Sequence, residues 1–108
     1  MNHVLKHHHR KAIVARLAAN ERVERAVLFG SRAIGTNSVS SDVDIALFGD
    51  RLTLSDQALL AAELELIPMA QSVDLVLFSS IGNRSLQEHI RQQGVEWYVR
   101  GIQAKTPT

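Results

Sequence analysis

Three aspartates and a Gly-Ser pair are the residues of this sequence whose types and spacing suggest chemistry. Gly30 and Ser31 follow an apolar run, and Asp42 and Asp44 open the next one. Glycine has no β-carbon, so the backbone at Gly30 can lie close to an anion, and the Ser31 hydroxyl can donate a hydrogen bond to it. The pair is therefore predicted to bind phosphate.

A short helix that begins at Ser31 or Arg32 would add to this phosphate site. Its first N–H groups and the positive end of its dipole would point toward the bound anion. Arg32 also follows the pair directly in the sequence and supplies a positive charge. We therefore expect Gly30, Ser31 and Arg32 to bind the phosphates together.

The sequence Asp42-Val43-Asp44 has the alternation of a strand with one charged face. In a strand, Asp42 and Asp44 lie on the same face and Val43 points into the core. Two adjacent carboxylates repel each other unless a cation or strong donors lie between them. Oxygen ligands favour a hard cation, and proteins often hold Mg²⁺ with one or two carboxylates and substrate phosphates. The alternative to a metal site is a strand face that is simply exposed to solvent. Aspartate is a poor strand former, so two of them in one strand favour the metal site.

Asp74 is the one charged residue in the apolar run from 73 to 78. Burying a lone carboxylate is unfavourable, so a strand through this run needs a partner for Asp74. A metal shared with Asp42 and Asp44 is such a partner, and a hydrogen-bonded structural aspartate is the alternative. We predict that these three catalytic residues bind one or two Mg²⁺ ions beside the phosphate turn, as in a nucleotidyl-transfer site.

Helices and strands alternate along the chain and must position these groups. Apolar spacing and turn residues predict helices over 11–19, from about 53 to 66 and 85–93, and strands over 26–29, 42–48, 73–78 and 95–99. Ser85 and Glu88 form a predicted capping box for the last helix, and Gly94 ends it. His89 on that helix is predicted to be a surface or packing residue rather than a ligand or base. The order predicts an α/β (α+β) sandwich with a small mixed sheet.

Composition places the chain among small globular proteins. Its 108 residues are 45% apolar, with a formal net charge of +1 when histidine is neutral. This predicts one domain over 1–108, with flexible ends at 1–8 and 101–108 and no room for a separate substrate domain. No dense block of Lys and Arg with interleaved aromatics is present, which disfavours dedicated nucleic-acid binding.

The chain has no cysteine, which excludes disulfides and thiolate zinc sites and gives no sign of an oxidising compartment. No apolar run reaches the ~18 residues of a membrane span, and the basic start lacks the apolar part of a signal peptide. We therefore expect a cytoplasmic protein. The cluster His7-His8-His9 is interpreted as a solvated segment, because three consecutive helical residues cannot all face one ion.

These residues together resemble the motif of the DNA polymerase β nucleotidyltransferase superfamily. Gly30-Ser31, ten intervening residues, Asp42-x-Asp44 and the later Asp74 match it, and the minimal nucleotidyltransferase branch (MNT) is the nearest match. The motif spans residues 30 to 74, and the length is similar to that of a whole MNT domain. Ile34 departs from the pattern, because a basic residue is common there. The resemblance implies the polymerase β-like fold, Mg²⁺ as cofactor and ATP as donor.

The same resemblance implies a partner. Stand-alone MNT proteins are often antitoxins paired with a helical HEPN-type toxin and are implicated in transferring AMP to a tyrosine hydroxyl on it, with Asp74 here as the residue that would activate the hydroxyl. Trp97 and Tyr98 are candidates for the partner surface, although a core role suits Trp97 better. One alternative is an MNT-like antitoxin that neutralises its partner by binding alone. Another is a small-molecule nucleotidyltransferase resembling the aminoglycoside-modifying enzymes, which usually carry a further helical domain.

Overall fold

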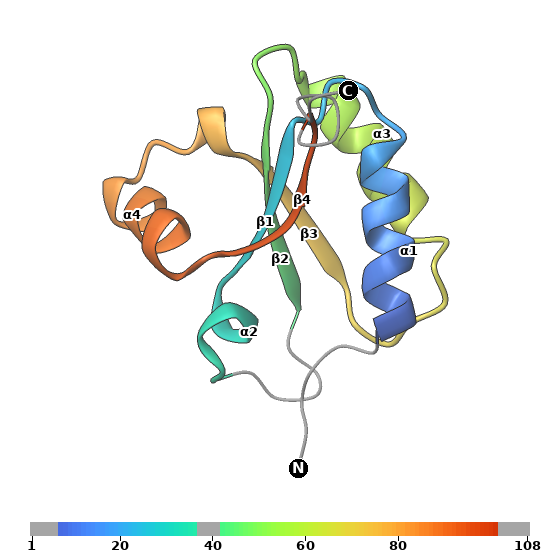
Figure 1. Cartoon of the computed structure of the whole chain (residues 1–108), viewed down its shortest axis with the longest axis horizontal. Coiled ribbons are helices and arrows are strands. Elements are labelled where there is room, and N and C mark those ends of the chain that lie inside the picture. Colours follow the sequence, from blue (N-terminus) through green and yellow to red (C-terminus); the bar gives the residue numbers. More distant parts are fainter. Residues whose placement is uncertain (1–6, 37–41, 102–108) are drawn as a thin grey trace, which may run out of the picture.

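A single mixed sheet forms the centre of the molecule in the computed structural model, which describes residues 7–36 and 42–101 (Figure 1). The strands lie in the order β3-β2-β1-β4. β1 is antiparallel to both of its neighbours, whereas β2 and β3 are parallel. The strand bounds are β1 Arg25–Phe29, β2 Val43–Phe48, β3 Val73–Leu77 and β4 Val95–Val99.

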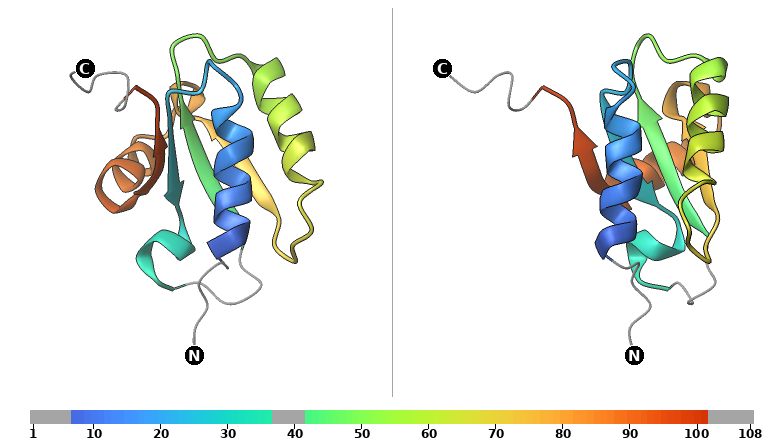
Figure 2. Two further views of the ribbon diagram at one scale, coloured as in Figure 1. Left: turned by 45° about the vertical axis from the view of Figure 1, so that its right-hand side comes forward. Right: turned by 90° about the vertical axis from the view of Figure 1, so that its right-hand side faces the viewer.

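Helices cover both faces of this sheet. α1 and α3 lie side by side on one face, α4 packs on the other, and the short α2 follows the end of β1 (Figures 1 and 2). Their bounds are α1 His7–Ala18, α2 Ser31–Ile34, α3 Leu54–Leu64 and α4 Arg84–Gln93, with a 3-10 turn at Phe78–Ser80. The predicted fold class and element order are confirmed. In the described ranges, no helix has the length and apolar character needed to cross a bilayer.

Several helix and strand ends differ from the prediction. α1 begins at His7 rather than Lys11, so the histidine cluster is helical and not part of a flexible end. α3 ends at Leu64, before the predicted end at Leu66, and β2 begins one residue after Asp42. The rest of the predicted flexible ends, residues 1–6 and 102–108, lies outside the described residues.

The predicted cap of α4 is wrong. The N-cap is Asn83, whose side-chain oxygen accepts a hydrogen bond from the Leu86 N–H at 3.0 Å, and the helix already includes Ser85. Asparagine and serine are about equally good N-caps, so the sequence offered two starts close together. The predicted stop is confirmed, since Gly94 is the C-cap.

Strand β2 separates the core from the candidate site. Val43 and Ile45 are fully buried in the cluster formed with α1 and α3, as their alternation with aspartate predicted. Ala46 belongs to a second cluster with Val27 and Ile90, on the face that α4 covers. Burying each large aliphatic side chain contributes about 1.5–3 kcal/mol, so both faces of β2 are held by apolar packing.

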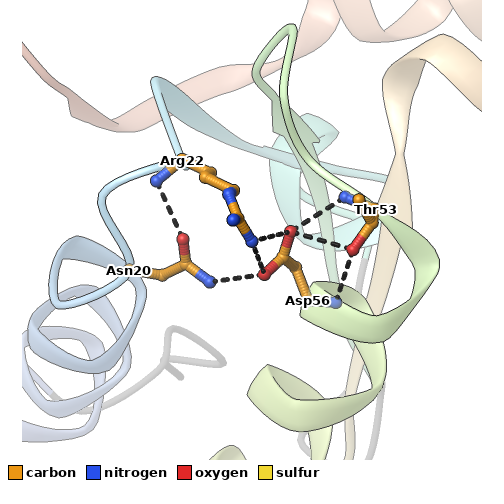
Figure 3. A network of polar contacts seen from close by, with 4 residues as sticks. All are labelled: Asn20, Arg22, Thr53 and Asp56. Atoms are coloured by element: carbon orange, nitrogen blue, oxygen red, sulfur yellow. Dashed lines mark hydrogen bonds and ion pairs between the residues drawn. The ribbon is translucent and has the colours of Figure 1, made fainter.

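The start of α3 is fixed by a polar network around Asp56 (Figure 3). Its carboxylate accepts hydrogen bonds from the Thr53 N–H at 2.9 Å and the Asn20 side-chain amide at 3.3 Å, and it pairs with Arg22 at 3.2 Å. The Thr53 backbone hydrogen bond is the main cause of a lowered Asp56 pKa, helped by Asn20, the Thr53 hydroxyl and Arg22 against the effect of burial. The network therefore anchors the helix that connects β2 to β3.

Candidate active site

Gly30 turns the chain from β1 into α2 with φ 82° and ψ −158°. A positive φ of this kind is costly for residues with a β-carbon. A β-carbon at Gly30 would also lie 2.7 Å from the Oδ2 atom of Asp44. The backbone conformation therefore requires glycine here, and a β-carbon would in addition displace the Asp44 carboxylate. Its contact with phosphate stays a prediction.

Helix α2 begins at Ser31, where the sequence predicted a short helix, and contains Arg32. It spans four residues, a single turn, in which the Ala33 N–H donates to the Gly30 carbonyl at 3.1 Å. The dipole of one turn is small, so the Ser31 hydroxyl and the Arg32 charge are the stronger candidates for an anion. Ile34, in the position where the family often has a basic residue, is exposed to solvent.

Strand register brings the Gly30 turn, Asp44 and Asp74 to neighbouring positions. Asp44 pairs with Phe29, the residue before Gly30, on the antiparallel side of β2, and with Asp74 on the parallel side. Adjacent strands lie about 4.8 Å apart, and residues paired in register point to the same face. Asp42 precedes β2 and, two residues before Asp44, belongs to the same face. The structure thus gathers the four predicted groups at one end of the sheet.

Electrostatics shows that the carboxylates influence one another. The pKa of Asp44 is raised, first by burial, then by the negative charge of Asp74 and then by that of Asp42. Asp74 itself is exposed, so the prediction that it is a buried carboxylate in need of a partner is wrong. β3 is an edge strand, and its residue 74 lies beyond the part of the face covered by α4. The half-buried member of the set is Asp44.

These carboxylates fit Mg²⁺ by their chemistry. Hard oxygen ligands from one or two carboxylates, completed by substrate phosphates and water, are the usual environment of Mg²⁺. Among the residues that the structure describes, no three acidic or imidazole groups already converge as a metal site. Mutual repulsion keeps unneutralised carboxylates apart, and an ion would draw the exposed side chains of Asp42 and Asp74 toward Asp44. Metal binding by these residues stays a prediction.

Helix α4 contributes a contact that the sequence did not indicate. The Nε2 atom of His89 accepts a hydrogen bond from the Gly30 N–H at 2.9 Å. The His89 ring also meets the ring of Phe29 edge to face, with centroids 6.2 Å apart. His89 is half-buried, as expected of a packing residue, but it packs on the Gly30 turn. The two hydrogen-bonded residues are 59 positions apart, so no local pattern pointed to this contact.

A surface cavity of about 360 Å³ lies beside Asp74. It is formed by the connection from α3 to β3 and includes Met69, Gln71 and Ser72 in its lining. A larger cavity of about 510 Å³ is lined by Phe48 and Phe78, toward the opposite ends of the strands, and includes none of the three aspartates. Of these two cavities among the described residues, the smaller one adjoins the candidate site.

Comparison with known protein families assigns the chain to a family. The family described as polymerase beta, nucleotidyltransferase, matches residues 11–101. The chain belongs to this family. No curated protein sequence gives a match.

Solved structures of toxin–antitoxin complexes resemble the chain. A chain of a toxin–antitoxin structure with AMP-PNP is 28% identical with a TM-score of 0.69, over 83% of this chain and 73% of that one. A chain of the MntA–HepT toxin–antitoxin is 24% identical with a TM-score of 0.65, over 87% and 73%. A chain of the complex of a tri-AMPylated Shewanella oneidensis HEPN toxin with its MNT antitoxin is 21% identical with a TM-score of 0.67, over 94% and 78%. The resemblance to MNT antitoxins is confirmed.

Proposed function

We propose that the protein is a Mg²⁺-dependent nucleotidyltransferase that transfers AMP from ATP to a tyrosine hydroxyl of a HEPN-type toxin and so acts as its antitoxin. The observation that carries the proposal is the pairing of Asp44 with Asp74 beside the Gly30 turn. Membership of the nucleotidyltransferase family supports the reaction class. The neighbours with AMP-PNP and with a tri-AMPylated toxin support the nucleotide and the acceptor.

The order of the strands suggests where each substrate would lie. The Gly30 turn follows β1, Asp44 is on the adjacent β2, and Asp74 is on the edge strand β3. The triphosphate would lie on the β1 side, where Ser31 and Arg32 are. The acceptor would approach from the β3 side, where Asp74 is exposed next to the cavity of about 360 Å³. In this arrangement the transferred phosphate would lie between the triphosphate site and the acceptor.

The chain's own residues would then have distinct roles. Gly30 would let the backbone approach the phosphates, while Ser31 would donate a hydrogen bond and Arg32 a balancing charge. Mg²⁺ bound to Asp42, Asp44 and Asp74 would neutralise the carboxylates and phosphates and polarise the reacting oxygens. The acceptor oxygen attacks the α-phosphorus, the α–β anhydride bond breaks, and pyrophosphate leaves. Asp74 would activate the acceptor hydroxyl, either by holding the Mg²⁺ that lowers the hydroxyl pKa or by taking the proton as a general base.

Co-expression with a HEPN-type partner tests this function directly. Intact-mass spectrometry of the purified complex should show the partner carrying one or more AMP units. The Asp42→Asn/Asp44→Asn double variant should bind the partner but leave it unmodified. Asp50→Asn, which removes an exposed carboxylate in the turn after β2, is the matched control and should modify the partner fully.

A binding-only antitoxin is the second candidate, favoured by the fact that the described carboxylates do not already converge on a metal position. It predicts a partner that is bound and inhibited but never gains mass. That result with the parent protein would remove the enzymatic function and leave the antitoxin role.

A further inference from the structure

We propose that His89 is a positioning residue that holds the Gly30 peptide in the orientation the phosphate turn requires. The proposal rests on the proposed nucleotide transfer and extends it to a residue outside the motif of the family. His89 lies on α4, on the face of the sheet that also carries Asp44. Its Nε2 atom and the Gly30 nitrogen are 2.9 Å apart.

The Gly30 N–H needs this partner because the sheet ends before it. β1 pairs with β4 only as far as Leu28 and Val95, and with β2 as far as Phe29 and Asp44. A backbone N–H that lies beyond its ladder must bond to water, a side chain or a ligand. The imidazole of His89 is the side chain that supplies this partner.

Helix α4 can hold the imidazole firmly because it is anchored directly on β1. Ile90, the next residue, is 2% exposed and packs in the cluster with Val27. Gly94 ends the helix so close to the sheet that a β-carbon there would overlap Val27. The rings of Phe29 and His89 also meet edge to face. The helix that carries the acceptor atom is thus packed against β1.

The position of the Gly30 peptide governs the groups that follow it. Gly30 has a left-handed φ of 82°, and its Cα faces the Asp44 carboxylate. A rotation of the peptide would move the Ser31 hydroxyl and the Gly30 Cα against Asp44 together. His89 thereby sets the distance from Gly30 and Ser31 to the Asp44 carboxylate, without itself touching either substrate.

Two substitutions that differ by one methylene separate this role from general packing. In His89→Gln the amide oxygen reaches about as far as Nε2 and can accept the same hydrogen bond, whereas in His89→Asn it falls short. Gln92→Asn makes the same shortening on an exposed residue of α4 that bonds only to Glu88 among the contacts the structure gives for it. All three are made in the full chain, and AMP-PNP with Mg²⁺ is the ligand.

Calorimetry should show that His89→Asn weakens AMP-PNP binding by about 3- to 10-fold, the effect of one lost hydrogen bond. His89→Gln should bind within about twofold of the parent, and Gln92→Asn should be unchanged. Equal affinity for His89→Asn and His89→Gln would overturn the proposal. Tighter binding by His89→Asn would also overturn it, because His89 would then compete with phosphate for the Gly30 N–H.

Nuclear magnetic resonance gives a readout that does not depend on nucleotide. A coupling between the Gly30 amide nitrogen and His89 Nε2, transmitted across the N–H···N hydrogen bond, should be present in the parent and absent in His89→Asn. The Ser31 amide resonance should shift in His89→Asn and not in His89→Gln. No coupling in the parent would overturn the role of His89. Failure of the parent to bind AMP-PNP would instead overturn the proposed nucleotide transfer, and the coupling would still decide whether His89 holds Gly30.

Discussion

Gly30 and Asp44 are packed so closely that a β-carbon on the glycine would lie 2.7 Å from the aspartate Oδ2 atom. Real β-carbons essentially never come that close to another atom, so any other residue at 30 must displace the carboxylate. Gly30 of the candidate phosphate turn and Asp44 of the candidate metal set are therefore in direct packing contact. A change at either residue alters the geometry of the other.

Gly30→Ala should weaken AMP-PNP binding by roughly tenfold or more, because it displaces Asp44 as well as straining the backbone. Gly35→Ala is the matched control, since Gly35 has a φ of 80° but open space around its Cα. Gly35→Ala should cost about 1–2 kcal/mol of stability, because Gly35 has a left-handed helical conformation. Gly30→Ala should cost more, because φ 82° with ψ −158° is a combination that essentially only glycine adopts. Thermal melts and calorimetry on both variants check this, and an equal loss of affinity would contradict the role of the Asp44 contact.

Asp44→Asn should stabilise the fold while lowering Mg²⁺-dependent AMP-PNP affinity. The pKa of Asp44 is raised by burial and by Asp74 and Asp42, so the folded state prefers the protonated form. Its stabilising contribution is lost as the pH rises through that raised pKa, and at pH 7 the charge is unfavourable. Because solvent screens the charges, we expect Asp44→Asn to raise the free energy of unfolding at pH 7 by about 0.5 kcal/mol, or the Tm by about 2–4 °C.

Melting curves at two pH values test the sign of this effect. The Tm advantage of Asp44→Asn should be present at pH 7 and disappear at about pH 3, where the parent carboxyl is protonated. Asp50→Asn controls for the loss of one negative charge. A lower Tm for Asp44→Asn at pH 7 would mean that the ionised carboxylate is stabilised by a partner.

Ser31→Ala should raise the KM for ATP with little change in kcat, because the hydroxyl is proposed to hold phosphate rather than to take part in bond breaking. The expected loss is about 0.5–1.5 kcal/mol, or about 3 kcal/mol if the hydroxyl meets a charged oxygen. Steady-state kinetics of partner modification measures it. The control is Ser85→Ala, which changes an exposed serine of α4 and should leave the KM unchanged. An unaltered KM for Ser31→Ala would exclude the contact of Ser31 with phosphate.

Asp56→Asn should destabilise the protein at neutral pH and make it less sensitive to acid. Hydrogen bonds from Thr53 and Asn20 and the charge of Arg22 lower the pKa of Asp56 below its ordinary value of 3.8. Ionised Asp56 therefore contributes to folding stability above pH 3.8, and this contribution is lost as the pH falls through the lowered pKa that Asp56 has in the folded protein. Urea titrations at pH 7 and at acid pH measure the difference. Equal acid sensitivity of parent and variant would show that other carboxylates dominate.

The sequence predicted the local geometry of β2 well, because strand alternation has a period of two residues. Alternation of Asp42 and Asp44 with Val43 and Ile45 placed two carboxylates on one face and two side chains in the core. Both statements follow from the geometry of a single strand. The Gly-Ser turn was likewise predictable, since it ends one apolar run.

Features that depend on how strands are ordered could not be predicted in this way. Asp74 was expected to be buried, yet β3 lies at the edge of the sheet and leaves it exposed. The contact of His89 with Gly30 requires α4 to lie on the same face as Asp44, which no pattern near either residue encodes. Strand order and the choice of face are set by packing between distant segments.

Strand β2 links the candidate site to the core, since Val43 and Ile45 are fully buried on the opposite face of the strand that holds Asp44. Removing a methyl group, as in Ile45→Val, costs about 0.5–1.5 kcal/mol and would leave most molecules folded. The same change would let β2 shift slightly toward the core. Asp44 would move with the strand, because it is the residue next to Ile45. We therefore expect positions 43 and 45 to vary less during evolution than equally buried positions on α1. A small shift of β2 would lower the proposed transfer activity while hardly changing the melting temperature.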